Sequence, residues 1–198
     1  MSNIKHLHDR MLKQINDYTQ EHSKVLMVPF DVKFPKEGNV DIHKNSQMGK
    51  CMARVMQKLK RDKSYQNLDP KYCYVREQLS SEHPHYHAYL LLNGRETQNG
   101  FLPLSYIQAC WSRMLGLTEV KKGLVHISRV TDKATPDFRG LAIKRGEPLP
   151  ADVQRRVSYM GKQHSKGAEG DGTRDFAMSQ QKPSNTKLQS TGKENNHG

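Results

Sequence analysis

The sequence predicts an α+β domain in which helices flank a central antiparallel sheet. Three observations favour this class. Segments with apolar residues at helical spacing alternate with strand-like segments, two of the strand-like segments stand close enough to form a hairpin, and no internal repeat is visible. At 198 residues the chain is long enough for one domain with a hydrophobic core.

Four segments carry apolar residues three and four positions apart, as an amphipathic helix requires. They are residues 3–22, 46–62, 104–117 and 150–164. The second has a basic outer face. Gly116 can terminate the third, and Pro150 and Asp152 are start signals for the fourth, which is also basic.

Four further segments have the composition of strands, and they are residues 24–34, 71–78, 85–92 and 121–130. Pro29 is expected to bend or interrupt the first, and residues 131–148 are expected to be a polar connection. From these patterns we expect an N-terminal helix over 1–23 and a folded domain over 24–166. The tail over 167–198 is predicted to be disordered, because its polar composition cannot support a core.

An excess of basic residues predicts an anionic partner. The net charge is +12, and the segment 165–198, with five Lys and Arg against four Asp and Glu, accounts for only +1 of it. The charge therefore belongs to the folded part, which favours nucleic acid over a membrane surface. Three scattered cysteines and an N-terminus without an apolar signal core predict a cytoplasmic protein with no membrane segment.

The run HPHYHAYLLLNG places two histidines two residues apart in a predicted strand. Residues i and i+2 of a strand face the same side, so His85 and His87 project together, with Tyr89 and Leu91 continuing that face. Tyr86 points the other way. Two neighbouring neutral imidazoles make half of a divalent-metal site.

Glu77 is the candidate for a third ligand, because it ends the strand before the histidine pair. If the two strands pair as an antiparallel hairpin, Glu77 lies opposite the histidines. Two histidines and one carboxylate suit Mg²⁺ or Mn²⁺ shared with a substrate, and also Zn²⁺. Asp31 and His126 stand on other predicted strands, and we assign neither to the site.

The basic helix over 150–164 supplies a candidate nucleophile. Tyr159, Lys162 and Lys166 share one helical face, and a nearby cation favours attack by a phenol whose ordinary pKa is about 10. Arg155 and Arg156, about one turn earlier, are predicted to contact the nucleic-acid backbone.

The order of these motifs resembles the HUH endonucleases of the replication-initiator (Rep) class. The segments KVLMVPFDVKF, YVREQ, HYHAYLLLNG and RRVSYMGK are more closely similar to the inovirus-type replication proteins, the YagK/YfjJ C-terminal-domain family. The resemblance covers about residues 20–166 and implies an HUH endonuclease domain of the split β-α-β type. It implies Glu77, His85 and His87 as metal ligands, Tyr159 as the nucleophile and Lys162 as its helper.

The resemblance further implies a rolling-circle-type replication initiator of a mobile element such as a phage. Such a protein nicks and rejoins single-stranded or hairpin origin DNA through a 5′-phosphotyrosine intermediate. No GxxxxGK[ST] motif is present, so a helicase and a polymerase of the bacterial host are the expected partners. Two alternatives stay open: a single-tyrosine HUH transposase, and a non-catalytic nucleic-acid-binding protein with a structural histidine site.

Overall fold

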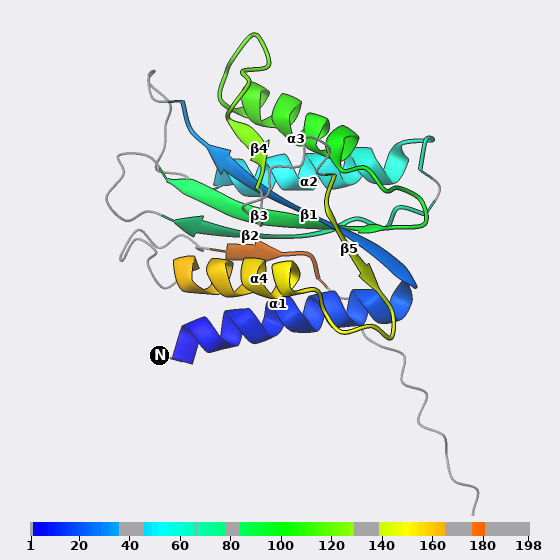
Figure 1. Ribbon diagram of the computed structural model, residues 1–198. Coiled ribbons are helices and arrows are strands. Elements are labelled where there is room, and N and C mark those ends of the chain that lie inside the picture. Colours follow the sequence, from blue (N-terminus) through cyan, green and yellow to red (C-terminus); the bar gives the residue numbers. More distant parts are fainter. Residues whose placement is uncertain are drawn as a thin grey trace, which may run out of the picture.

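The computed structural model describes residues 2–35, 46–65, 67–77, 84–128, 139–164 and 176–180. Its helices are α1 (Ser2–Glu21), α2 (Ser46–Arg61), α3 (Phe101–Met114) and α4 (Ala151–His164), and its strands are β1 (Lys24–Lys33), β2 (Lys71–Glu77), β3 (His85–Asn93), β4 (Val125–Ile127), β5 (Leu141–Lys144) and β6 (Phe176–Met178). The sheet lies between α2 and α3 on one face and α1 and α4 on the other (Figure 1). The predicted α+β class is confirmed.

The sheet is antiparallel throughout its described pairs. Its order is β4-β1-β3-β2-β6, and β5 also pairs with β1. β1 and β2 lie on either side of β3, so they run parallel to each other, and α2 connects them along the chain. This is the split β-α-β arrangement that the resemblance implied. The hairpin expected between β2 and β3 is also present.

Pro29 stands within β1 without interrupting it. On one side of β1, β5 pairs with Lys24–Met27 and β4 pairs with Phe30–Val32, so Pro29 falls in the gap between these two short partners. The carbonyl of Pro29 accepts a hydrogen bond from the Ser128 N–H on that side. Pro29 has no N–H to return to Ser128, so the β1–β4 pairing ends there, while β1 itself continues through its pairing with β3.

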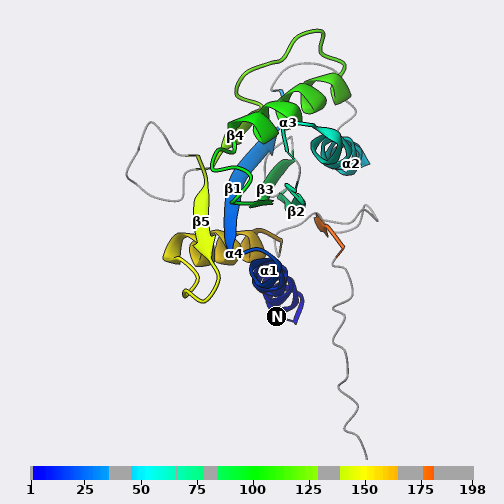
Figure 2. The ribbon, with the colours of Figure 1, turned by 90° about the vertical axis from the view of Figure 1, so that its right-hand side faces the viewer.

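The two faces of the sheet build two hydrophobic clusters. Alternate residues of β3 separate between them: Tyr86, Ala88, Leu90 and Leu92 pack toward α2 and α3, whereas Tyr89 and Leu91 pack toward α1 and α4. Figure 2 shows the same two helical layers from the side. α1 buries its apolar stripe in the second cluster, so the N-terminal helix expected over 1–23 belongs to the same packed unit as the sheet.

Three sequence predictions of element bounds need correction. The helix expected over 104–117 is α3, which begins earlier and ends at Met114, with Gly116 at φ 71° just beyond it as expected. The strand expected over 121–130 is only the three residues of β4. The connection expected over 131–148 contains β5. Both strands owe their position to β1, whose long edge pairs with short segments that carry little sequence pattern of their own.

Part of the tail predicted to be disordered joins the sheet. β6 pairs with β2, and Ser179 just beyond it exchanges hydrogen bonds with the backbone of Tyr72. The remaining tail residues, 165–175 and 181–198, lie outside the described part. Within that part, no helix is both long and apolar enough to cross a membrane.

Candidate functional site

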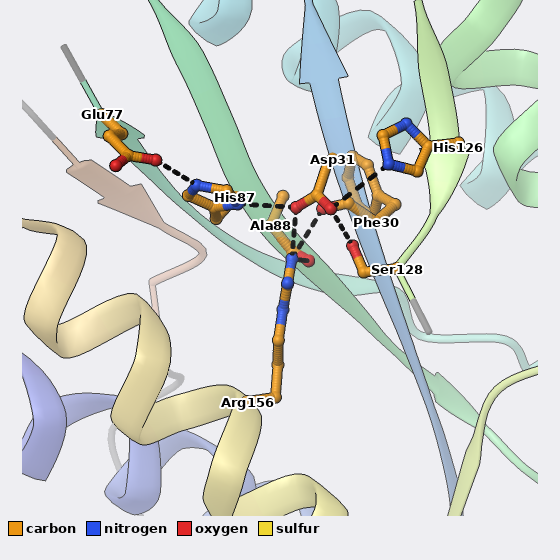
Figure 3. A network of polar contacts seen from close by, with 8 residues as sticks. All are labelled: Phe30, Asp31, Glu77, His87, Ala88, His126, Ser128 and Arg156. Atoms are coloured by element: carbon orange, nitrogen blue, oxygen red, sulfur yellow. Dashed lines mark hydrogen bonds and ion pairs between the residues drawn. The ribbon is translucent and has the colours of Figure 1, made fainter. Parts of the chain in front are cut away.

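Strand register brings five predicted or considered residues to one end of the sheet. Glu77 of β2 lies directly across from His85 of β3. On the other side of β3, Asp31 of β1 pairs with His87, and it also pairs with His126 of β4. The site is therefore a row of side chains across four adjacent strands, seen from close by in Figure 3.

The imidazole of His87 is held at both ring nitrogens by carboxylates. Nδ1 lies 2.7 Å from Oδ1 of Asp31, and Nε2 lies 2.7 Å from Oε2 of Glu77. His87 is 8 % exposed, so these contacts replace hydration that the buried ring has lost. An ionised carboxylate only accepts hydrogen bonds, so the ring is the donor wherever it bonds one of them.

Asp31 is the centre of the polar network in Figure 3. In addition to His87 it accepts hydrogen bonds from the Ser128 hydroxyl at 2.5 Å and from Nη2 of Arg156 at 2.9 Å, and His126 Nε2 lies 3.5 Å away. Burial opposes ionisation of Asp31, but the bonds from His87 and Ser128 and the Arg156 charge prevail and hold its pKa well below the usual range. Asp31 is thus a fixed negative charge behind His87.

His85 shares the face of His87 but stands nearer the rim. It is partly exposed, and burial together with the nearby Lys33 charge lowers the pKa of its imidazole, which keeps it neutral at pH 7. The ligand atoms of Glu77, His85 and His87 do not all lie within 4.8 Å of one another. Among the described residues the group that meets this spacing is Glu21, His22 and Asp69, in which Lys71 already pairs with Asp69.

α4 places Tyr159 against this row. The rings of Tyr159 and His87 meet edge to face, with centroids 5.0 Å apart and an interplanar angle of 83°. Tyr159 is 42 % exposed, an unusual exposure for a large aromatic residue in this protein. Lys162 is exposed one turn further along α4, and Arg155 is exposed one turn earlier.

Comparison with known families agrees with this architecture. The family model of the YagK/YfjJ C-terminal domain matches residues 3–179, which is most of the chain and includes every element from α1 to β6. The chain belongs to this family. No curated protein and no solved structure matches the chain significantly.

In this YagK/YfjJ C-terminal domain, Arg156 has a position that its predicted role does not fit. It was expected to contact nucleic acid, but it is 6 % exposed, and its Nη2 contacts the carbonyls of Phe30 and Ala88 as well as Asp31. A guanidinium enclosed in this way ties α4 to β1 and β3 at the site. Arg155, by contrast, is on the surface and pairs only loosely with Asp152, at 3.4 Å. Lys166 lies outside the described residues.

The residues at this end of the sheet fit a divalent cation by their chemistry. A metal-bound imidazole usually donates its second N–H to a carboxylate, and Asp31 already accepts from Nδ1 of His87. That leaves Nε2 of His87 and the carboxylate of Glu77, 2.7 Å apart, as a ready pair of donors, with neutral His85 beside them. This pair would hold a cation between its two ligand atoms.

Asp31 and Arg156 are the functional residues that sequence reasoning missed or assigned otherwise. Asp31 could have been recognised from the sequence, because it follows Phe30 in an apolar strand. A carboxylate buried in such a strand needs a partner. Arg156 offers no such signal, because on a basic helix a buried arginine and an exposed one look alike in the sequence.

Proposed function

We propose that this domain nicks and rejoins single-stranded origin DNA, with Tyr159 as the nucleophile and Glu77, His85 and His87 as ligands of Mg²⁺ or Mn²⁺. The contact between the Tyr159 and His87 rings carries the proposal, since it brings the phenol from the late helix beside the histidine pair. The net charge of +12 supports an anionic substrate.

The proposed reaction is an exchange of phosphate ester bonds. The Tyr159 oxygen bonds to the scissile phosphorus and loses its proton, while the bond from phosphorus to the 3′ oxygen breaks. That oxygen takes up a proton and becomes a free 3′-OH, and the 5′ end stays on Tyr159. A bound cation would neutralise charge on the phosphate oxygens. Attack by a 3′-OH on the phosphotyrosine reverses these steps and rejoins the strand.

The other side chains at the site have separate proposed roles. Asp31 and Arg156 fix the His87 ring, and so fix the side of Tyr159 that packs against it. Lys162 is one turn from Tyr159 on the exposed surface of α4, where its ammonium would favour the phenolate and the entering phosphate. The exposed part of Tyr159 leaves the phenol accessible to a DNA strand.

The test is formation of a protein–DNA adduct that survives denaturing electrophoresis. The full chain is mixed with single-stranded oligonucleotides that tile the DNA around its own gene, in Mn²⁺ or Mg²⁺. We expect an adduct with the wild type and none with Tyr159→Phe. The matched control is Tyr72→Phe, a partly exposed tyrosine on β2 that should form adduct normally. An adduct with Tyr159→Phe, or none with the wild type on any oligonucleotide, rejects the proposal.

One observation favours a second candidate, a nucleic-acid-binding protein in which His87 is only structural. Both nitrogens of His87 are already bound by carboxylates, so the network is complete as it stands. This candidate predicts tight DNA binding with no adduct, and DNA affinity that does not change when divalent metal is removed. The adduct assay and a binding titration in chelator separate the two.

A further inference from the structure

A row of cations runs along the far side of the molecule from Tyr159. Lys50, Arg54, Lys58 and Arg61 stand at successive turns on one side of α2, and Arg113 of α3 faces them. All five are exposed. We call these five residues the basic groove. It lies over the sheet face opposite to the one that carries α4 (Figure 1).

The surface beside this row is hollowed, along the C-terminal half of α2 and between α2 and α3. Two adjoining hollows of about 390 and 230 Å³ share Arg54 and Lys58 in their walls. Arg61 lines the larger and Arg113 the smaller. A concave surface lets several cations approach one rod-shaped anion at the same time, whereas a flat helix surface presents them one by one.

The cations of the basic groove are not neutralised by the protein. None of the five forms an ion pair with a carboxylate in the described part of the chain, whereas Lys13 and Lys144 elsewhere on the surface each do. Asp62 is the carboxylate that lines the groove, and its charge interacts with that of Lys58, so one negative charge faces the five positive ones. Its Oδ2 accepts from the Tyr106 hydroxyl at 2.5 Å, and its Oδ1 accepts from the Ser64 backbone at 2.9 Å.

The groove offers charge without a base-stacking platform. Tyr106 is the aromatic residue that lines it, and Lys58 covers that ring with Nζ 4.0 Å from the centroid. Proteins that hold single strands without sequence preference rely on open aromatic faces. From Lys50 to Arg61 the row spans about 16 Å along α2, which is long enough to reach across a major groove about 12 Å wide.

We propose that the basic groove binds the phosphate backbone of double-stranded DNA beside the cleaved single strand. The inference rests on the proposed function for the nature of the substrate, and it adds a second contact surface on the opposite face of the sheet. A protein with both surfaces would hold the duplex that flanks an origin while Tyr159 acts on the exposed strand. Sequence-independent backbone contacts of this kind anchor a protein without reading bases.

The first experiment compares two triple variants with the same loss of three positive charges. Arg54→Gln/Lys58→Gln/Arg113→Gln removes three of the five positive charges of the groove, and the control Lys13→Gln/Lys24→Gln/Lys144→Gln changes exposed cations elsewhere. Binding of a blunt 20-base-pair duplex is titrated from 50 to 300 mM salt. We expect the affinity of the groove variant for the duplex to be lower, on the order of 100-fold, at 0.1 M salt. The slope of log affinity against log salt should become smaller in magnitude by about three.

Adduct formation on a short single strand is measured for both variants in the same preparation. We expect it to stay at the wild-type level, so a failure of the groove proposal remains distinct from a failure of the nicking proposal. Equal loss of duplex affinity in both variants would attribute binding to net charge alone and overturn the inference. Unchanged duplex binding by the groove variant would also overturn it.

Cys110 offers a second readout in the unaltered protein. It lines the smaller hollow, and a hydrogen bond with the Cys51 thiol, together with the Arg54 and Arg113 charges, lowers its pKa to about 7. Cys51 and Cys73 are buried, so Cys110 is the cysteine expected to react with iodoacetamide. Saturating duplex should slow its alkylation at least several-fold, as followed by mass spectrometry. An unchanged rate with bound duplex places the DNA elsewhere and rejects the groove.

Discussion

The ring of Tyr159 packs edge to face against the ring of His87, with centroids 5.0 Å apart. Because Asp31 and Glu77 hold both nitrogens of His87, this imidazole cannot turn without breaking a short hydrogen bond. Tyr159 therefore rests against a fixed surface while much of its own ring stays exposed. In the proposed reaction, a phenol placed in this way would be oriented before DNA binds, which would lower the entropy lost on reaching a reactive geometry.

Replacing each of the two histidines of β3 should lower the free energy of unfolding by a different amount. His87→Ala removes a buried ring and leaves Asp31 and Glu77 without its protons, so we expect a loss of about 2–4 kcal/mol in the free energy of unfolding. His85→Ala, at the rim, should cost less than about 1 kcal/mol. Both variants should lose adduct formation. Urea denaturation beside the adduct assay checks this, and equal destabilisation by the two would contradict it.

Asp31 should make stability depend on pH in the acid range. Its pKa is held well below the ordinary value in the folded protein, so its contribution is fully present above the unfolded pKa of about 4 and is lost as the pH falls toward the folded pKa. Asp31→Asn should destabilise by about 3 kcal/mol at pH 7, because Arg156 loses its buried partner.

The pH series itself is the check on this assignment. The difference between wild type and Asp31→Asn should shrink below pH 4, measured by urea denaturation from pH 3 to 7. Asp17→Asn, at a surface pair on α1, is the matched control and should change stability by less than about 0.5 kcal/mol at every pH. A difference that grows toward low pH would show that Asp31 is not ionised in the fold.

Much of the fold follows from local pattern, because its larger elements bury one regular face. The His85-to-Leu91 alternation identified both faces of β3, and Gly116 marked the end of α3. β5 and β6 escaped prediction because they have four and three residues, and a segment so short is a strand only where a long neighbour offers a free edge. Pro29 did not interrupt β1, because the pairing of β1 with β3 continues through that position.

The part of the candidate site that depends on one hairpin could be predicted from the sequence. The part that depends on the arrangement of the whole sheet could not. Glu77 and the histidines lie close in the chain, so their approach follows from β2–β3 pairing. Asp31 contacts His87 only because β1 pairs with β3 in this register. More than fifty residues separate the two in the sequence, so no local pattern predicts their contact. Arg156 is buried by the docking of α4 over that register, and no local pattern records such docking.

Metal removal should stop the reaction and spare the fold. The His87 network is held by protons, Asp31 and Arg156, so a chelator removes no bond on which packing depends. We expect EDTA to abolish adduct formation and to shift the melting temperature by less than about 2 °C, with activity restored by Mn²⁺. Unfolding in EDTA would instead identify a structural metal. Because metal ligands bind in their deprotonated form, the Mn²⁺ concentration needed for half-maximal rate should fall as the pH rises.

Substitution of the two neighbouring arginines of α4 should distinguish a residue that contacts DNA from one that supports the site. Arg155 is exposed, so Arg155→Gln should reduce the salt slope of single-strand binding by about one and change stability by less than about 0.5 kcal/mol. Arg156→Gln removes the buried contacts to Phe30, Ala88 and Asp31, so it should cost about 3 kcal/mol in stability. The salt slope of Arg156→Gln, measured below its unfolding temperature, should equal that of the wild type. A reduced slope for Arg156→Gln would mean that this guanidinium leaves its buried position to reach the DNA, and Asp31 would then lack its partner whenever DNA is bound.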